Sequence, residues 1–404
     1  MRWRASIALL LQSAFAFAAS SADDVPASNG DYCHELEARR TGEITEASRE
    51  RIEAALLACR LKQDVEAAEV EKALGANAIA LKVKGDNALF LARSASPEVM
   101  LLGTFAAPME RVGNTELWAS RFRMASLEKG MINYFAWDQE RKPLSPSAID
   151  WRGPLAPAVP KTTPKIKGTI VKRTLWSEAL QETRRVRIYL PPGYSTQRKY
   201  KTLYVGDGTF IDGWSTYVEP MIEQKAIPPI VIVGAEEGQT GIVEDRSSLG
   251  VDIRSADYLP AYEGAGDRFD RHMRFFALEM VPFAEKEFAL ATGRANRAIQ
   301  GQSSSATFAR EAALRHPELF NTVLAFSIGW TAPNQFGPPN AKRARFVLTA
   351  GFYEAPFYRN TKKSAKVLRE QGFDVTEDYL AAGHDPNAWA IMLAKYLPGA
   401  FGKN

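Results

Sequence analysis

Ser303 lies where an expected strand turns sharply into an expected helix, within the segment 297–306 that reads RAIQGQSSSA. Such a turn presents a serine hydroxyl as a nucleophile, and small neighbours such as Gly301 and Ser305 leave the space that a strained turn needs. Ser303 stands two residues after Gly301 and places the Ser304 amide where it can donate to an oxyanion. Ser305 departs from the glycine usual in this motif, and a polar serine loop is the alternative. The strand-to-helix context favours Ser303 as the catalytic nucleophile.

His384 is the histidine best placed to act as the base that a serine nucleophile requires. It lies in the loop 382–386, after the expected strand 374–380 and before a C-terminal helix. An α/β-hydrolase orders its nucleophile, acid and base along the chain in this way. A surface histidine in a turn is the alternative. The other histidines lie in expected helices or at a helix end: His34, His272 and His316.

Glu354 is the predicted acid, because it follows the expected strand 345–350 and lies between nucleophile and base in the chain. Its carboxylate would fix the tautomer of the imidazole and stabilise the imidazolium. Asp374 is the second candidate. It stands at the start of a strand, which would point it to the wrong edge of the sheet.

A second oxyanion donor is expected after an early strand of the sheet. The expected strand 201–205 leads into a glycine-containing turn, and the amides of Gly208 and Thr209 are the candidates. A glycine that serves only the tight turn is the alternative.

The elements that must position these residues alternate between strands and helices over residues 167–404. This alternation predicts a mostly parallel sheet covered on both faces, and hence the α/β class with an α/β-hydrolase fold. The strand-like runs are 185–190, 201–205, 230–233, 298–300, 322–326 and 345–349, and the helical runs are 271–288 and 306–315.

Residues 23–75 are rich in Glu, Ala, Arg and Leu, and Gly42 divides them into an expected hairpin of two helices. The only two cysteines, Cys33 and Cys59, lie here. In an exported chain an even pair favours a disulfide. Two cysteines without a neighbouring histidine cluster make a poor metal site, so no metal is predicted.

Residues 1–22 read as a secretory signal peptide, with Arg2 and Arg4 before the apolar run 5–19. A membrane anchor is the alternative, but the run is shorter than the roughly 20 residues that cross a bilayer. No later segment is long and apolar enough to span a membrane. We therefore expect a periplasmic or secreted protein without stable membrane insertion.

Short alternating runs over residues 76–142 predict a small β-sandwich. The segment 143–166 is rich in proline and lacks periodicity, which predicts a stiff linker and a domain boundary. The formal net charge of +4 comes from 51 basic and 47 acidic residues, which is unlike the concentrated positive field of a nucleic-acid binder.

From about residue 76 onward the chain resembles the enterochelin (enterobactin) esterase family, within the esterase group that also includes feruloyl esterases. The order and spacing of several motifs carry the resemblance. They are 184–194, Asp207-Gly208, Arg254 with Asp257-Tyr258, 301–306, 316–320, 351–354, and Gly383-His384-Asp385 with Trp389.

The resemblance implies that residues 76–142 are the immunoglobulin-like domain of that family, which contributes to the substrate entrance. It also implies substrate-binding roles for Arg254, Asp257 and Trp389. A structural ion pair between Arg254 and Asp257 is the alternative, and the long loop 236–267 around them suggests a lid. Ala382 and Pro386 depart from the family pattern, and Pro386 could reshape the pocket.

These observations predict an exported serine esterase that needs no metal or organic cofactor. Its substrate is a small-molecule or saccharide ester, such as a siderophore trilactone or a feruloylated or acetylated polysaccharide. A different class of protein, a catalytically inactive exported ligand-binding protein, stays open because a fold does not guarantee activity. The oligomeric state and the role of the helical hairpin are not predicted.

Overall fold

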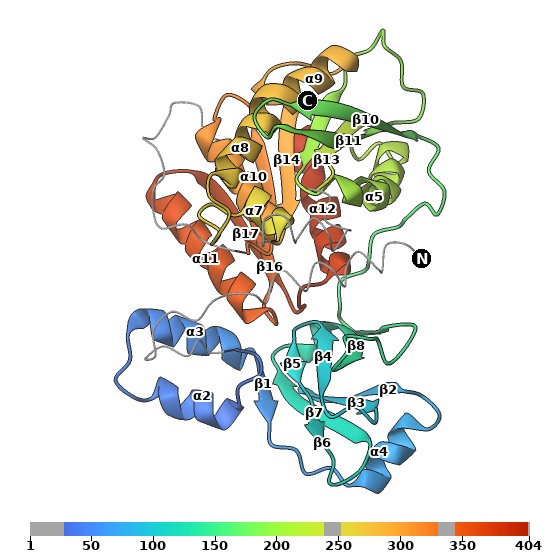
Figure 1. The fold of residues 1–404 in the computed structure, drawn as a ribbon, viewed down its shortest axis with the longest axis vertical. Helices are drawn as coiled ribbons and strands as arrows, with labels where there is room; N and C mark the ends of the chain where they lie inside the picture. The colour runs from blue at the N-terminus through green and yellow to red at the C-terminus, as the bar shows by residue number, and fades with distance from the viewer. Residues whose placement is uncertain (1–27, 238–251, 330–343, 403–404) are drawn as a thin grey trace.

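The computed structural model describes residues 28–237, 252–329 and 344–402. The predicted signal peptide lies outside these residues. Figure 1 shows a smaller N-terminal part, drawn in blue to green, below a larger C-terminal part that contains the predicted site residues. Within the described ranges, no helix has both the length and the apolar character that crossing a bilayer requires.

The C-terminal part is built on an eight-stranded sheet with the order β10-β11-β13-β12-β14-β15-β16-β17. The first three strands pair antiparallel, and each later pair, from β13 with β12 onward, is parallel. The central strands are covered on both faces and buried, as in the apolar β13. The bounds are β10 (Thr169–Ser177), β11 (Glu182–Leu190), β12 (Lys201–Val205), β13 (Ile230–Ala235), β14 (Arg297–Gln302), β15 (Thr322–Phe326), β16 (Arg345–Gly351) and β17 (Asp374–Leu380).

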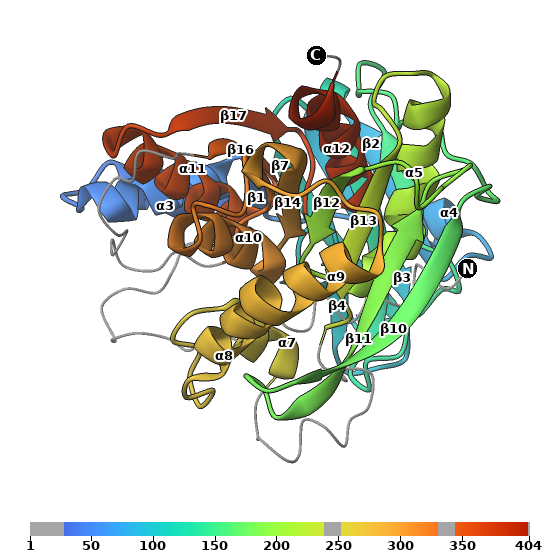
Figure 2. The ribbon, with the colours of Figure 1, turned by 90° about the horizontal axis from the view of Figure 1, so that it is seen from above.

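Helices cover both faces of this sheet, as the view in Figure 2 shows. One buried cluster joins the sheet to α8, α9 and α10 through Met273, Ala284 and Phe308. The other joins it to α5 and α12 through Trp214 and Leu393. The helices are α5 (Ile211–Glu223), α7 (Ile253–Tyr258), α8 (Arg268–Arg274), a π-helical turn (Phe275–Met280), α9 (Val281–Glu287), α10 (Ser304–Arg315), α11 (Ala355–Glu370) and α12 (Pro386–Phe401).

The N-terminal part contains two antiparallel sheets that enclose an aromatic core. Phe90 of one sheet packs edge-on against Tyr134 of the other, with ring centroids 5.0 Å apart. The first sheet contains β1 (Ala58–Leu61), β2 (Ile79–Lys84), β3 (Asn87–Arg93), β6 (Glu110–Arg111) and β7 (Leu117–Met124). The second contains β4 (Val99–Gly103), β5 (Ala107–Pro108), β8 (Met131–Asp138) and β9 (Ile149–Arg152).

The segment before these sheets is more complex than the expected two-helix hairpin. Helices α2 (Cys33–Arg40) and α3 (Glu46–Leu56) flank Gly42 as expected, but β1 and a third helix, α4 (Ala67–Leu74), follow. The helical spacing that extended to Cys59 ends at Leu56, because β1 pairs antiparallel with β7. Cys59 therefore lies in a strand, and it forms a disulfide with Cys33.

The expected linker 143–166 begins within the second sheet. Residues Ile149–Arg152 form β9, which pairs antiparallel with β8. The prolines that suggested a linker flank this short strand, at Pro146 and Pro154, where they interrupt no ladder. The boundary between the two parts therefore falls after Arg152.

Candidate active site

Ser303 occupies the turn between β14 and α10, with φ 59° and ψ −129°. A positive φ is strained for a residue with a side chain, and such strain is concentrated at functional positions. Its amide donates to Phe326 O of the neighbouring strand at 2.9 Å. A Cβ at Gly301 would collide with the backbone of Ser305, so the turn requires glycine there.

Ser305, the residue that departs from the usual glycine, ties this turn together. Its hydroxyl bonds Asp207 Oδ2 at 2.7 Å and the carbonyl of Gln302 at 2.8 Å, and it accepts from the Gln302 amide at 3.0 Å. Asp207 directly precedes the candidate oxyanion residue Gly208. The serine thus links the Ser303 turn to the loop after β12.

Glu354 and His384 meet at the same edge of the sheet. Oε2 of Glu354 lies 2.5 Å from Nδ1 of His384. Oε1 accepts from the Gly351 amide at 2.9 Å. Asp374, the second candidate for the acid, begins β17, and its carboxylate lies 3.9 Å from Arg345 at the start of β16. It is therefore at the opposite edge, as its place at the start of a strand predicted.

Two aromatic rings pack against the buried imidazole of His384. The Phe357 ring lies 4.3 Å from it, and Trp389 packs edge-on at 4.8 Å. Its Nε2 is buried and has no hydrogen-bond partner within the described ranges. With Nδ1 held by the carboxylate, Nε2 is the atom available for proton transfer.

The elements bring Ser303 to the edge that carries Glu354 and His384. These residues follow β14, β16 and β17, whose carboxyl ends lie together because the strands are parallel neighbours of β15 or of each other. Ser303 bonds the last residue of β15, and the next residue, Ser327, donates to Glu354 Oε1 at 2.5 Å. A short chain of contacts thus joins the three predicted residues.

Ser327 is a site residue that sequence analysis missed. It has φ 56°, it donates to Glu354, and it accepts from Trp389 Nε1 at 2.9 Å. Its place directly after β15, next to the strand that carries the nucleophile, was the available signal. Trp389, predicted to contact substrate, is buried and donates to Ser327, and its contact with substrate stays a prediction.

The predicted oxyanion donors lie on the two elements that flank the nucleophile. Ser304 is the first residue of α10, where amides have no acceptor within the helix. Gly208 and Thr209 belong to a 3₁₀ turn, Gly208–Phe210, that follows β12. A Cβ at Gly208 would collide with Ala235, so the turn also needs glycine for packing.

Arg254 and Asp257, the predicted substrate-binding residues, do not form the ion pair that was the alternative reading. Arg254 makes a bidentate contact with Asp207, at 2.7 and 2.9 Å. Asp257 bonds Arg184 at 2.9 Å and Arg268 at 2.6 Å. The two side chains have different partners because both lie on α7, a buried helix that occupies part of the expected lid loop. Residues 238–251 of that loop lie outside the described ranges.

Asp257 is fully buried, with both carboxylate oxygens paired. Burial alone would raise its pKa, but the guanidinium groups of Arg184 and Arg268 outweigh that effect and hold the pKa well below its usual range. Arg254 is also buried, and its Nη1 has no partner in the part of the chain that the structure describes. Asp257 is therefore committed to internal contacts, whereas Arg254 keeps one donor.

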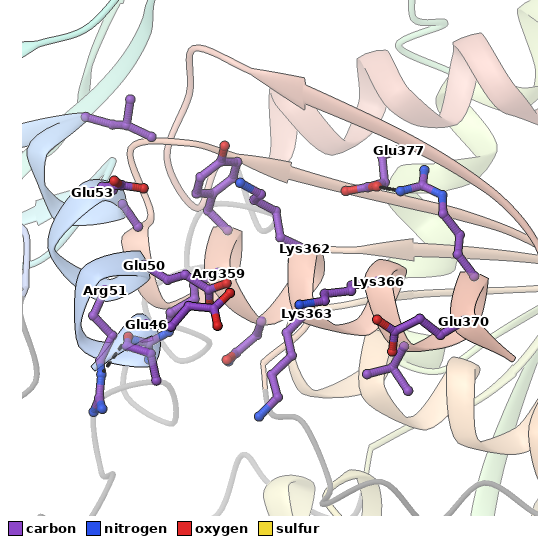
Figure 3. Close-up of a pocket in the computed structure, with 17 residues that line it drawn as sticks. Glu46, Glu50, Arg51, Glu53, Arg359, Lys362, Lys363, Lys366, Glu370 and Glu377 are labelled. Carbon is purple, nitrogen blue, oxygen red and sulfur yellow. Dashed lines mark hydrogen bonds and ion pairs between the residues drawn. The ribbon is translucent and has the colours of Figure 1, made fainter. Parts of the chain in front are cut away.

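A groove of about 970 Å³ lies away from these residues, between α3 and α11. Figure 3 shows Glu46, Glu50 and Glu53 of α3 near Arg359 and Lys363 of α11. The lining includes none of the predicted catalytic residues, although α11 begins directly after the acid. Among the described residues, no group of three or more His, Cys, Asp or Glu side chains is arranged to hold a metal ion.

Residues 177–393 match the family model described as "Putative esterase". The endo-1,4-beta-xylanase/feruloyl esterase of Xylanibacter ruminicola is 26% identical over 250 residues, covering 58% of this chain and 31% of that protein. The uncharacterized protein YjcH of Bacillus subtilis is 26% identical over 160 residues, covering 39% of this chain and 60% of that protein. The chain thus spans less than two thirds of the length of either relative.

Two solved structures are similar over most of the chain. The enterobactin esterase of Shigella flexneri, in the presence of 2,3-di-hydroxy-N-benzoyl-serine, has a TM-score of 0.58 at 18% identity, covering 80% of this chain and 96% of that one. The ferric enterobactin esterase of Salmonella typhimurium has a TM-score of 0.57 at 17% identity, covering 80% and 97%. These likenesses show an α/β-hydrolase-like fold, and with the family match they confirm the resemblance predicted from the sequence.

Proposed function

The chain belongs to the "Putative esterase" family, and from this premise we propose that it hydrolyses carboxylic esters by acyl transfer to Ser303. The observation that carries the proposal is the state of the His384 ring. Its Nδ1 lies 2.5 Å from the Glu354 carboxylate, while its buried Nε2 has no partner among the described residues. The carboxylate orients the ring, and the free Nε2 can accept a proton once the Ser303 hydroxyl, which is not bonded to it here, closes on it in the substrate complex.

In the proposed mechanism, Nε2 of His384 takes the proton of the Ser303 hydroxyl as Oγ attacks the ester carbonyl. The Ser304 amide and an amide of Gly208 or Thr209 donate to the oxyanion. Collapse of the intermediate breaks the bond to the alcohol, which leaves with the proton from the imidazolium. Water, deprotonated by the same imidazole, then releases the acid and regenerates the serine.

For the substrate we propose a siderophore trilactone, because the enterobactin esterases resemble this chain over four fifths of its length. Arg254 supports an anionic ligand, because its Nη1 has no partner among the described residues and the side chain binds Asp207, next to the Gly208 turn. An ester of a feruloylated or acetylated polysaccharide is the second candidate, because the curated relative from Xylanibacter ruminicola carries a feruloyl esterase name. Turnover of ferric enterobactin, a feruloyl sugar and short acyl esters would separate these candidates.

We also keep two proposals that follow from the sequence. Residues 1–22 would direct export to the periplasm or outside the cell. The two antiparallel sheets would correspond to the immunoglobulin-like domain of the family. N-terminal sequencing of the mature protein would test the first proposal.

Replacing Ser303 tests the central proposal. We expect S303A to abolish hydrolysis of a small aryl ester and labelling by a fluorophosphonate, with unchanged thermal unfolding. S120A is a matched control, since this buried serine lies in β7 and its hydroxyl has no partner in the described chain. Hydrolysis by S303A at the wild-type rate would refute the proposal, and an unlabelled wild-type protein would support the inactive ligand-binding alternative.

A further inference from the structure

The loops that carry Glu354 and His384 are bonded to each other. The Tyr353 amide donates to Ala382 O at 2.9 Å. A Cβ at Gly351 would collide with Ala382, so the two loops pack backbone against backbone. A displacement of either loop would therefore alter the contact between the carboxylate and the imidazole.

The N-terminal part holds the loop of His384 by its backbone. The amide of His384 itself donates to Thr104 O at 3.1 Å, and the Met131 amide donates to Ala381 O at 2.7 Å. A Cβ at Gly383 would collide with Thr104 O, so glycine is required for this close approach. The position of the imidazole thus depends on a turn that lies outside the C-terminal part.

That turn is itself fixed by the Thr104 side chain, which is fully buried. Its hydroxyl donates to Asn133 O at 3.1 Å and accepts from the Asn133 amide at 2.9 Å. The Thr104 amide also donates to Asn133 O, at 2.8 Å. The hydroxyl therefore anchors the Thr104 carbonyl to β8.

The loop of Glu354 is held from the segment before α2. The buried Asn29 side chain accepts from the Ala355 amide at 3.2 Å and donates to Ala58 O at 2.9 Å. The amide of Ala355, which begins α11 directly after the acid, is thus tied to β1 beside the disulfide of Cys59. The Tyr353 hydroxyl, on the other side of the acid, donates to Ala125 O at 2.8 Å.

We propose that Thr104 and Asn29 are positioning residues, through which the N-terminal part aligns His384 with Glu354 for catalysis. The inference rests on the proposed function of these two residues. It gives the α2–α3 segment and its disulfide a role, which is to hold Asn29 against the acid-bearing loop. Because misplacement of a reacting group by about 1 Å can cost about a hundredfold in rate, modest loosening of either anchor would reduce kcat.

The first test compares T104V with T104S. Valine has nearly the same shape as threonine but removes the two hydrogen bonds of the hydroxyl to Asn133 and keeps the one from the backbone amide, whereas serine keeps the hydroxyl. We expect T104V to lower kcat about tenfold or more with little change in KM, and T104S to restore most of the rate. Rates are expressed per active site, counted by fluorophosphonate labelling.

The second test compares N29A with N77A. Asn77 also donates to a backbone carbonyl in the N-terminal part, Leu74 O at 3.2 Å, but contacts neither loop. We expect N29A to lower kcat and N77A to leave it unchanged. In an E354Q background the N29A effect should shrink, because the residue it positions is already altered.

The split between kcat and KM separates positioning from general destabilisation. At a temperature where thermal unfolding shows every variant to be folded, a positioning role lowers kcat per active site and leaves KM unchanged, whereas a purely structural role leaves both at their wild-type values. Wild-type kcat in both variants would overturn the inference, and N29A with N77A decides alone should T104V fail to fold. Activity in S303A would instead refute the proposed function, whatever these variants do.

Discussion

Ser327 donates a 2.5 Å hydrogen bond to Glu354 and accepts one from Trp389, so a residue directly after a third strand, β15, orients the candidate acid. The bond occupies Oε1 and leaves Oε2 for the imidazole. A carboxylate with both oxygens assigned cannot rotate without losing a partner. Ser327 thus helps to keep the Glu354 carboxylate aligned with the His384 imidazole.

We predict that S327A lowers kcat about tenfold, or ~1.4 kcal/mol, because the carboxylate loses a donor and the Trp389 indole loses its acceptor. W389F should have a smaller effect, since the bond from Ser327 to Glu354 remains. Steady-state kinetics on an aryl ester checks both variants. A wild-type kcat in S327A would show that the remaining contacts suffice to orient the acid.

The sequence predicted best those residues whose position in the fold depends on a local pattern and on their order in the chain. Ser303 and Glu354 could be placed because each follows a buried strand, and parallel strands bring their carboxyl ends to one edge. Contacts between side chains far apart in the sequence could not be predicted. Arg254 pairs with Asp207, forty-seven residues earlier, and no local pattern distinguishes that partner from the nearby Asp257.

The same limit explains the errors in the N-terminal part. The strand β1 contains only four residues, ACRL, and its conformation comes from pairing with β7 rather than from alternation. Strand β9 lies among prolines that predicted a linker, and it exists because β8 offers a free edge. Thr104 carries no motif at all, since its importance lies in what its carbonyl and hydroxyl contact.

We predict that S305A lowers the free energy of unfolding by about 1.5 to 3 kcal/mol, because a hydrogen bond to the buried Asp207 carboxylate is lost. It should also lower kcat, since the turn of Ser303 loses its tie to the Gly208 loop. Urea denaturation and steady-state kinetics measure the two effects. S120A, which removes a buried hydroxyl without a described partner, should change neither. An unchanged stability in S305A would mean that Arg254 and Gln302 satisfy Asp207 alone.

We predict that His272 makes stability fall as the pH decreases below about 6.5. Burial among Tyr258, Phe275 and Phe308 lowers the pKa of this histidine to about 3. The folded state therefore excludes a proton that the unfolded state binds, and the free energy of unfolding should drop by about 1.4 kcal/mol per pH unit through this window. In H272L, which keeps a similar volume, that slope should be absent from urea denaturation between pH 6.5 and 4.5. An equal slope in both proteins would contradict the prediction.

We predict that Asp385, next to the candidate base, makes the protein less stable as the pH rises, which is opposite to the effect of His272. Burial, reinforced by Asp150, raises the pKa of this carboxyl to about 6, although the Asn387 amide bonds it. Between about pH 4 and 6 the folded state keeps a proton that the unfolded state has lost. The free energy of unfolding should therefore decrease as the pH rises through this window, by about 3 kcal/mol in all, and stay level above it.

The variant D385N isolates this contribution, because asparagine keeps the oxygen that caps α12 and removes the titration. The stability of D385N relative to wild type should increase by about 3 kcal/mol between pH 4 and pH 7, measured by urea denaturation. The stability of H272L relative to wild type should decrease over the same pH range. Each variant is therefore a control for the other. A difference between D385N and wild type that does not vary with pH would mean that Asp385 titrates near its ordinary pKa, and that its burial is relieved by contacts beyond the Asn387 amide.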